Sequence, residues 1–408
     1  MAIPTLNAYI NFSTGAVFTG DLYLDTGKLD INTLSGPTLI VDVSNLLDGI
    51  TTTRGRNAQA DQFQTGTLSM RLIDQNGDFN PQNTNSPYYG LLSPMRKVVI
   101  SANYEGINYP IFAGFITSYT TTTPKTANDI VYTTMTAVDG FRLAQNAQIA
   151  TVAGTSAGQL SGARITAILD AIAWPITQRD IDTGLTTVQA DPGTQRTALA
   201  AMQTVETTEY GALYCGKNGD FVFQDRTVTT ASVSGTPVVF KDDGTGIAYY
   251  NAVWRLDDTL VYNQANITAT GLTVQTASNQ ASIDKYFLHS YNQQNLLMQD
   301  TATALNYAQS YVASRAETSI RCDAISLDLY TDNYSAGITA ALDLDFFDPV
   351  TITTNQPGAS TLTKTLQVFG INHTITPNSW KTTLTTLEPI IDGFILDYSM
   401  LDSGVLSY

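Results

Sequence analysis

The chain has 408 residues, of which only 14% are charged, and its formal net charge at pH 7 is −16. This length gives material for two to four domains, and a hydrophobic fraction of 43% excludes wholesale disorder. The excess of acids excludes tight binding to a nucleic-acid backbone, which requires lysine and arginine, and no apolar run is long enough for a membrane span.

The first residues of the chain carry no export signal. Met1 to Thr5 lack the basic head and the apolar core of a secretory leader. For a chain without such a leader, two reduced and partly buried thiols are favoured over a disulfide between Cys215 and Cys322.

The first third of the sequence alternates apolar and polar residues, which is the pattern of half-buried strands. It predicts strands at 68–72, 98–104, 109–119 and 130–137, with a turn between the second and the third. We therefore expect an antiparallel barrel or sandwich over about residues 36–145.

The middle of the sequence changes period. Apolar residues over 165–172 recur at the i, i+3, i+4, i+7 spacing of an amphipathic helix, which Pro175 would end. A second helix is predicted near 199–205, and a hairpin with an Asn-Gly turn is predicted at 214–221. These elements predict a small α+β unit over 160–230.

The second half returns to strands around one further helix. Strands are predicted within 250–275, and a helix is predicted from Asp300, a suitable N-cap, to about Glu317. The remaining predicted strands lie at 320–330, 350–354, 366–375 and 380–387.

One loop resembles the beginning of a calcium site. Oxygen-bearing side chains alternate from Asp74 to Asn80, as they do in a calcium-binding loop. However, Gly77 stands at the fourth position rather than the sixth, and Asn85 occupies the twelfth position, where a bidentate glutamate is needed. We therefore expect a tight turn in which Asp and Asn side chains cap their own backbone.

Other residues that could carry chemistry are scarce. The chain has two histidines, His289 and His373, and no H-x-x-H or C-x-x-C pair that would suggest zinc. No nucleophile elbow or glycine-rich phosphate loop is present, and nothing selects one carboxylate pair among the 36 acids as a glycosidase site. The sequence predicts no catalytic residue, no metal site and no cofactor.

A run of acids near the C-terminus is more informative. No basic residue occurs between Arg321 and Lys364. This acidic run can be a solvated face that serves solubility, or a surface that repels a polyanion. The candidate acids are Asp323, Asp328, Asp332, Asp343, Asp345 and Asp348.

Several short motifs, in a fixed order, resemble the minor tail proteins of long-tailed bacteriophages. They cover most of the chain from about residue 50 onward. They are TRGR at 53–56, GTL at 66–68, GDFNPQN at 77–83, SPYYGLLSP at 86–94, FAGFI at 112–116, AVDGF at 137–141, EYGALY at 209–214, GDFVF at 219–223, GINHTI at 370–375 and WKTTL at 380–384.

This resemblance implies a tail-tip or baseplate hub with a mainly β (α+β) fold, in which two tail-tube-like β-barrels carry smaller α+β inserts. The implied division is 1–145 for an N-terminal segment and the first barrel, 146–240 for an α+β insert, 241–290 for the first part of the second barrel, 291–340 for a helix-containing insert, 341–390 for the second part of that barrel, and 391–408 for a C-terminal tail.

The resemblance also implies a role and partners. A homotrimer would present six barrels and so join a sixfold tail tube to a threefold tip, at the virion tail tip, after assembly in the host cytoplasm. Its neighbours would be a distal tail ring protein and a central fibre or tip protein, and DNA would pass through without tight binding. The six aspartates would then face the lumen, and no enzymatic activity is expected. The alternatives are a glycan-binding receptor-recognition protein and the adjoining distal tail ring protein.

Overall fold

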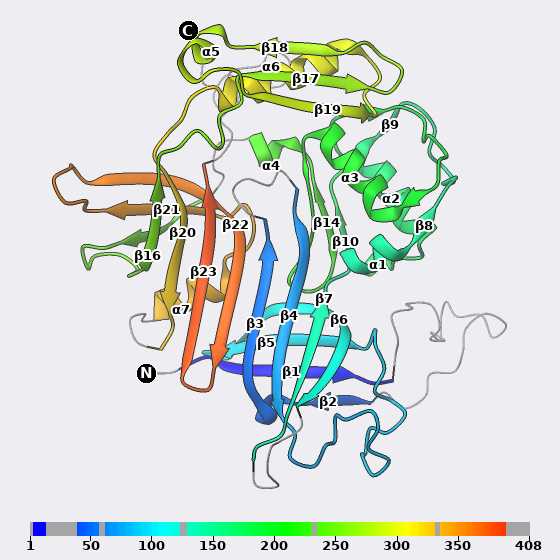
Figure 1. Cartoon of the computed structure of the whole chain (residues 1–408), viewed down its shortest axis with the longest axis vertical. Helices are drawn as coiled ribbons and strands as arrows, with labels where there is room; N and C mark the ends of the chain where they lie inside the picture. The colour runs from blue at the N-terminus through cyan, green and yellow to red at the C-terminus, as the bar shows by residue number, and fades with distance from the viewer. Residues whose placement is uncertain are drawn as a thin grey trace.

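The computed structural model describes residues 3–13, 39–56, 62–122, 129–230, 235–330 and 335–388. Its largest feature is one twisted antiparallel sheet, on which two smaller α+β units lie (Figure 1). The prediction of a mainly β fold with smaller α+β inserts is confirmed.

The N-terminal part of the large sheet follows the predicted alternation. In β4, alternate residues from Gly66 to Leu72 are buried, so one face of the strand packs on the core. The neighbours run in the order β3-β4-β7-β6-β5-β1-β2, and all pairs are antiparallel. These strands are β1 (Thr5–Asn11), β2 (Ile40–Asp42), β3 (Leu47–Gly55), β4 (Gln64–Ile73), β5 (Lys97–Tyr104), β6 (Ile107–Thr122) and β7 (Tyr132–Val138), with a 3-10 turn, η1 (Ser44–Leu46), before β3.

The C-terminal part of the same sheet contains the remaining long strands. Their order is β16-β20-β23-β22, and β21 pairs with the first half of β22 and, in parallel, with β15. Helix α7 (Ser335–Asp343) precedes β21. The strands are β15 (Val238–Lys241), β16 (Tyr250–Arg255), β20 (Arg321–Asp328), β21 (Pro349–Thr354), β22 (Leu362–Thr376) and β23 (Ser379–Leu387).

The two parts join through β3 and β22, which lie side by side at the centre of Figure 1. Residues 50–55 of β3 pair with residues 370–375 of β22, so the 13 strands form a single sheet. Within the described residues the path of pairs runs from β16 to β2 without closing, so the two predicted tail-tube-like barrels are not confirmed. The long strand β22 pairs with β21 along its first half and with β3 along its second half.

The first α+β unit follows β7. Its three-stranded sheet has the order β10-β14-β13, and helices α2 and α3 pack against each other beside it. Both predicted helices and the predicted hairpin are present, and Gly219 has the positive φ of its turn. The elements are α1 (Phe141–Asn146), β8 (Gln148–Ile149), β9 (Gln159–Leu160), α2 (Ser161–Ala171), η2 (Ile176–Gln178), β10 (Arg179–Ile181), β11 (Thr187–Val188), β12 (Arg196–Thr197), α3 (Ala198–Glu209), β13 (Ala212–Cys215), β14 (Phe221–Gln224) and α4 (Arg226–Thr230).

The second α+β unit has its own small core, formed where α6 packs on a three-stranded sheet of order β18-β17-β19. The predicted N-cap is present, since the Thr303 amide donates to Asp300 Oδ1 at 2.7 Å. The predicted strands within 250–275 thus fall into two sheets, β16 in the large one and β17 in this one. The elements are β17 (Gln264–Ala269), β18 (Gln275–Ser278), α5 (Gln280–Tyr286), β19 (Ser290–Leu296) and α6 (Thr301–Arg315).

Replacement of Gly55 by alanine tests the central joint. Gly55 has φ of +106°, and a Cβ there would lie 2.2 Å from the carbonyl oxygen of Phe369 on β22. Because the obstacle is backbone, Gly55→Ala should lower the free energy of unfolding by about 3 kcal/mol, measured by urea denaturation.

The matched control is Gly106→Ala, since Gly106 also has a positive φ but has no neighbour within 4 Å of the added Cβ. This control carries backbone strain alone and should cost about 1 kcal/mol. Equal losses for the two variants would show that the close approach of β3 to β22 contributes nothing.

Candidate functional site

The predicted acids fall into two groups. Asp323 and Asp328 lie on β20, whereas Asp343, Asp345 and Asp348 lie around the turn between α7 and β21. Asp332 lies outside the described residues. The predicted face is therefore divided between a strand of the large sheet and a turn.

The β20 acids have basic neighbours from other strands. Asp323 accepts a hydrogen bond from Arg321 Nε at 2.7 Å, and its other oxygen lies 2.9 Å from Arg255 Nε on β16. Asp328 stands opposite Lys381 in the register between β20 and β23. The stretch that lacks bases in the sequence is thus bordered by bases in space.

The acids around the turn also lie near bases from distant parts of the sequence. Asp345 Oδ1 lies 3.4 Å from Arg54 Nη1, and Asp345 Oδ2 lies 3.9 Å from Lys217 Nζ. Asp348 Oδ2 accepts a hydrogen bond from the Asp345 amide at 2.7 Å, while burial raises the pKa of Asp348 above its ordinary value. Asp343 is exposed, and its carbonyl oxygen accepts from Lys217 Nζ at 2.8 Å.

A buried polar joint surrounds Arg54, which is 7% exposed on β3. Its Nη2 donates to the Cys215 carbonyl oxygen at 3.1 Å, and its guanidinium lies 4.8 Å from the centre of the Phe346 ring. Asp139 accepts from the amides of Gly66, at 2.5 Å, and Phe141, at 3.0 Å. Burial nevertheless raises the pKa of Asp139 to about 7. The joint thus connects the large sheet, the first α+β unit and the acid-bearing turn.

The loop that resembles a calcium site is a capped turn. Asp74 Oδ1 accepts from the Asp78 amide at 2.6 Å, and its Oδ2 accepts from the Phe79 amide at 3.2 Å and from Thr133 Oγ1 at 2.8 Å. The carboxylate is therefore directed at its own backbone and at β7, as the turn prediction required. Within the described residues, no group of three or more His, Cys, Asp or Glu side chains is arranged to hold a metal ion.

His373 and the two cysteines are buried and have protein partners, whereas His289 is half-buried. His373 Nδ1 lies 2.9 Å from Thr382 Oγ1 and accepts from Trp380 Nε1 at 3.3 Å, and burial lowers its pKa to about 3. Such a histidine stays neutral at neutral pH and is a structural part of the core. Cys215 and Cys322 are both free thiols and both buried, as predicted. In the described parts of the chain, no helix is long and apolar enough to cross a membrane.

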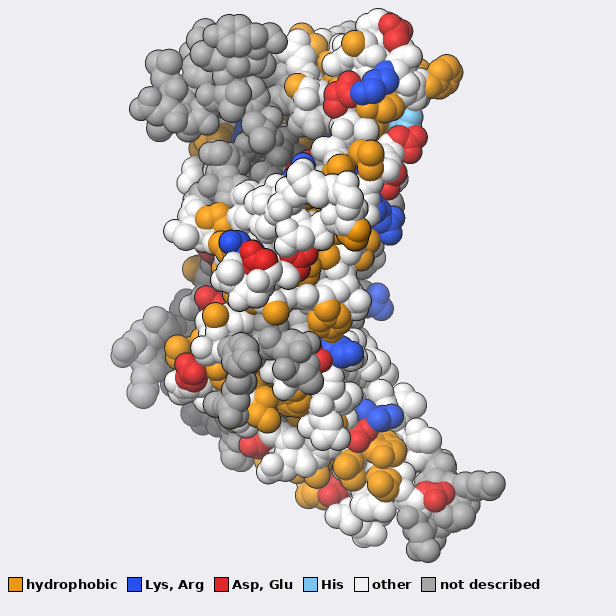
Figure 2. Space-filling model, turned by 90° about the vertical axis from the view of Figure 1, so that its left-hand side faces the viewer, with side chains coloured by type: hydrophobic (Ala, Val, Ile, Leu, Met, Phe, Trp, Pro, Cys, Tyr) orange, Lys and Arg blue, Asp and Glu red, His pale blue; other side chains and the backbone are white. Residues whose placement is uncertain are grey.

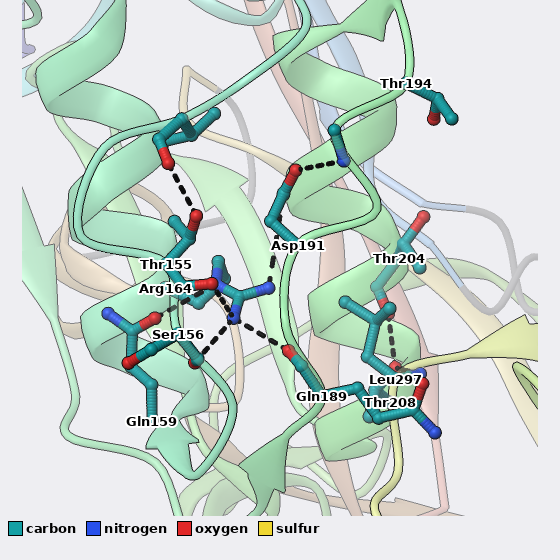
Figure 3. A network of polar contacts seen from close by, with 12 residues as sticks. Thr155, Ser156, Gln159, Arg164, Gln189, Asp191, Thr194, Thr204, Thr208 and Leu297 are labelled. Carbon is teal, nitrogen blue, oxygen red and sulfur yellow. Dashed lines mark hydrogen bonds and ion pairs between the residues drawn. The ribbon is translucent and has the colours of Figure 1, made fainter.

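Sequence reasoning missed a buried arginine on α2 (Figure 3). The Arg164 side chain is 0% exposed, and its Nη2 donates to the carbonyl oxygens of Thr155, Ser156 and Gln189 at 3.3, 3.2 and 2.8 Å. Its Nε donates to Gln159 Oε1 at 3.0 Å. A signal was available, because Arg164 stands four residues before Ile168 and so shares its buried helix face.

The segment that Arg164 fixes also holds the second α+β unit. The Gln189 amide donates to the Leu297 carbonyl oxygen at 2.7 Å, and its Nε2 donates to the carbonyl oxygens of Met298, at 2.6 Å, and Thr270, at 3.0 Å. Leu297 in turn donates to Thr208 Oγ1 of α3 at 3.0 Å. These hydrogen bonds join the first and the second α+β unit into one continuous wall.

A cavity of about 650 Å³ opens between this wall and the end of the large sheet. Its described lining comes from β4, α1, α3, β19 and α6 and from residues next to these elements, which belong to distant parts of the sequence. Aromatic and guanidinium groups are prominent, among them Phe63, Tyr210, Tyr291, Arg56 and Arg315. No sequence motif predicts this cavity, because only the fold brings its walls together.

The sequence matches no protein-family profile and no curated protein, but the fold matches solved structures. One is the 43 kDa tail protein of prophage MuSo2 from Shewanella oneidensis, with a TM-score of 0.56, 12% identity, and coverage of 87% of this chain and 97% of that one. Another is a tail protein from Neisseria meningitidis, with a TM-score of 0.54, 11% identity, and coverage of 85% and 97%. The resemblance to phage tail proteins is thus confirmed at the level of the fold.

Replacement of Asp139 by asparagine should flatten the pH dependence of stability. The folded chain holds this proton more tightly than the unfolded chain, because burial raises the pKa from 3.8 to about 7. Its contribution to the free energy of unfolding is therefore greatest below pH 4 and falls as the pH rises to about 7. Urea denaturation of the wild type and Asp139→Asn across this range should show a shallower fall for the variant. The exposed change Asp284→Asn is the control, and an unchanged slope in Asp139→Asn would contradict the assignment.

Replacement of Arg164 by lysine should destabilise the wall of the cavity. One ammonium cannot reach the four acceptors that the guanidinium serves, and they would remain buried. We expect Arg164→Lys to lower the free energy of unfolding by about 3 kcal/mol. The exposed Arg142→Lys on α1 should change it by less than about 0.5 kcal/mol. A loss in Arg164→Lys no larger than in this control would show that the network is dispensable.

Proposed function

We propose that the chain is a non-enzymatic structural hub of a bacteriophage tail tip, which joins the sixfold tail tube to the threefold tip and encloses the passage for DNA. The observation that carries the proposal is a fold shared with two tail proteins, one of them from a prophage, over 87% and 85% of this chain and 97% of each of theirs. The partners would be two further copies, the distal tail ring protein and a central fibre or tip protein.

The edges of the large sheet support assembly into a ring. Among the described strands, the long path of the sheet ends at β2 and β16, and its branch through β21 ends at β15; the two ends of the path leave backbone groups available to a neighbour. Ile40 on β2 is 57% exposed and Val253 on β16 is 38% exposed, so both edges offer apolar surface. Because the two edges differ, a contact between them is head-to-tail and must close into a ring to remain finite.

The surface also favours extensive contacts between subunits. Figure 2 shows charged side chains scattered among uncharged and hydrophobic ones on the side of the molecule that faces the viewer. Burying such a surface removes few charges from water, and its hydroxyl and amide groups can hydrogen-bond across an interface. Within a ring, the exposed members of the six candidate acids would face the passage and repel DNA rather than bind it.

The stoichiometry of assembled tails tests this proposal. Each chain supplies two strand-rich parts to one sheet, so three chains provide the six parts that a sixfold tube would meet. A cryo-EM reconstruction of the tail tip should show three copies in one ring, with Asp343 and its neighbours towards the axis.

Two outcomes would contradict the proposal. Six copies in the ring would favour the alternative role, that of the adjoining distal tail ring protein. A single copy on the axis would contradict the ring, and lysines towards the axis with the aspartates on the outer rim would contradict the repulsive lining.

A further inference from the structure

The three-stranded sheet of the second α+β unit, at the top of Figure 1, has two different faces. Helix α6 covers one face, where Ala265, Ile267 and Tyr291 are buried in the small core. The residues that alternate with these point the other way and form what we call the open face, on which every side chain is exposed or half-buried. They are Gln264, Asn266 and Thr268 from β17, Thr276 and Ser278 from β18, and Ser290 and Asn292 from β19.

The register of the three strands arranges the open face in rows. β17 lies in the middle, antiparallel to β18 and parallel to β19. Neighbours in a row are about 4.8 Å apart, and successive outward residues of one strand are about 6.6 Å apart. The face thus presents hydrogen-bonding groups at regular intervals in two directions. The two rows are Ser278-Gln264-Ser290 and Thr276-Asn266-Asn292.

Hydrogen bonds between side chains hold both rows in one orientation. Asn266 Nδ2 donates to Asn292 Oδ1 at 2.8 Å, and Asn266 Oδ1 accepts from Thr276 Oγ1 at 2.8 Å. In the other row, Ser290 Oγ donates to Gln264 Oε1 at 3.0 Å. Because the oxygen of Asn292 is turned towards Asn266, its Nδ2 is turned away from that neighbour and can donate to a ligand. The open face is therefore ordered before any ligand arrives, which lowers the entropy cost of binding.

The composition of the three strands restricts the chemistry of a ligand. They contain no charged residue, in a chain that has 36 acids and 20 bases. A polyanion would need lysine or arginine, and a divalent cation would need carboxylates. The centre of a protein interface is rich in aromatic residues, methionine and arginine, whereas the open face consists of amides and hydroxyls. The ligand that fits this face is neutral and rich in hydroxyl groups.

We propose that the open face binds a neutral saccharide chain. A sugar hydroxyl both donates and accepts a hydrogen bond, as the amides and hydroxyls of this face do together, so neighbouring hydroxyls of one sugar can bond to one row. Val274, which is 54% exposed just before β18, offers an apolar contact to the C–H groups of a sugar. This binding role goes beyond the proposed structural role. It does not depend on a ring of subunits, because one chain supplies the whole face.

An array of neutral oligosaccharides, and of matched members that carry carboxylate or phosphate groups, tests the proposal with the full chain. Neutral members should bind in preference to acidic ones, because the face has no base to pair with an anion and the chain has a net charge of −16. Binding of neutral members should not change with salt concentration, since no ion pair is formed.

A pair of matched variants assigns the binding to the open face. Asn292→Asp keeps an oxygen that accepts from Asn266, but it removes the amide donor and brings a charge to a neutral face. Calorimetry with the best-bound neutral member should show binding that is about tenfold weaker. Asn306→Asp, on the exposed side of α6, adds the same charge away from this face and should bind as the wild type does.

A third variant tests the face without a change of charge. Thr276→Val removes the hydroxyl that holds Asn266, while valine remains well suited to a strand. Neutral binding should become about threefold weaker. The circular dichroism spectra of all three variants should match that of the wild type.

Four outcomes would overturn the proposal. They are no binding to any neutral member, a salt-sensitive preference for acidic members, equal binding by Asn292→Asp and Asn306→Asp, and an open face covered by another protein in the assembled tail tip. The copy number in the ring of subunits is unaffected by the first three results, so the structural role and the saccharide site can fail separately.

Discussion

The pairing of β3 with β22 is the constraint on which the rest of this structure depends. It brings residues 50–55 against residues 370–375, and nearly the whole chain lies between them in sequence. The entropy of closing so long a loop grows only slowly with its length, so two α+β units can lie between the partners. Without this pairing, the N-terminal and C-terminal strands would be two sheets with two more edges to protect.

Charge is arranged around the same joint. Arg54 on β3 reaches Asp345, which follows α7, and the carbonyl oxygen of Cys215 in the first α+β unit. Three segments therefore meet at one guanidinium. Its five donors can reach partners in all three segments, which the single ammonium of a lysine could not do. The acids of the base-free stretch are likewise compensated by distant residues, because neighbours on other strands, such as Arg255, supply the bases that this stretch lacks.

Local patterns predicted the elements well, and they failed where the structure depends on distant partners. Alternation in β4 and the Asp300 cap of α6 act within a few residues, so they are visible in the sequence. The sharing of β22 between β21 and β3, and a cavity whose described lining comes from five elements, depend on pairings that no local pattern encodes. Arg164 is intermediate, since its place on a buried helix face was visible but its carbonyl partners were not.

The edges of the large sheet and the cavity are separate features of this chain. Among the described strands, the path of the large sheet ends at β2 and β16, where backbone groups are available to a further strand. The cavity is walled by α3, β19 and α6 of the same chain, so its geometry is set before any assembly. The network of Arg164 and Gln189 holds the cavity wall without using either edge, so a change at an edge should leave this wall in place.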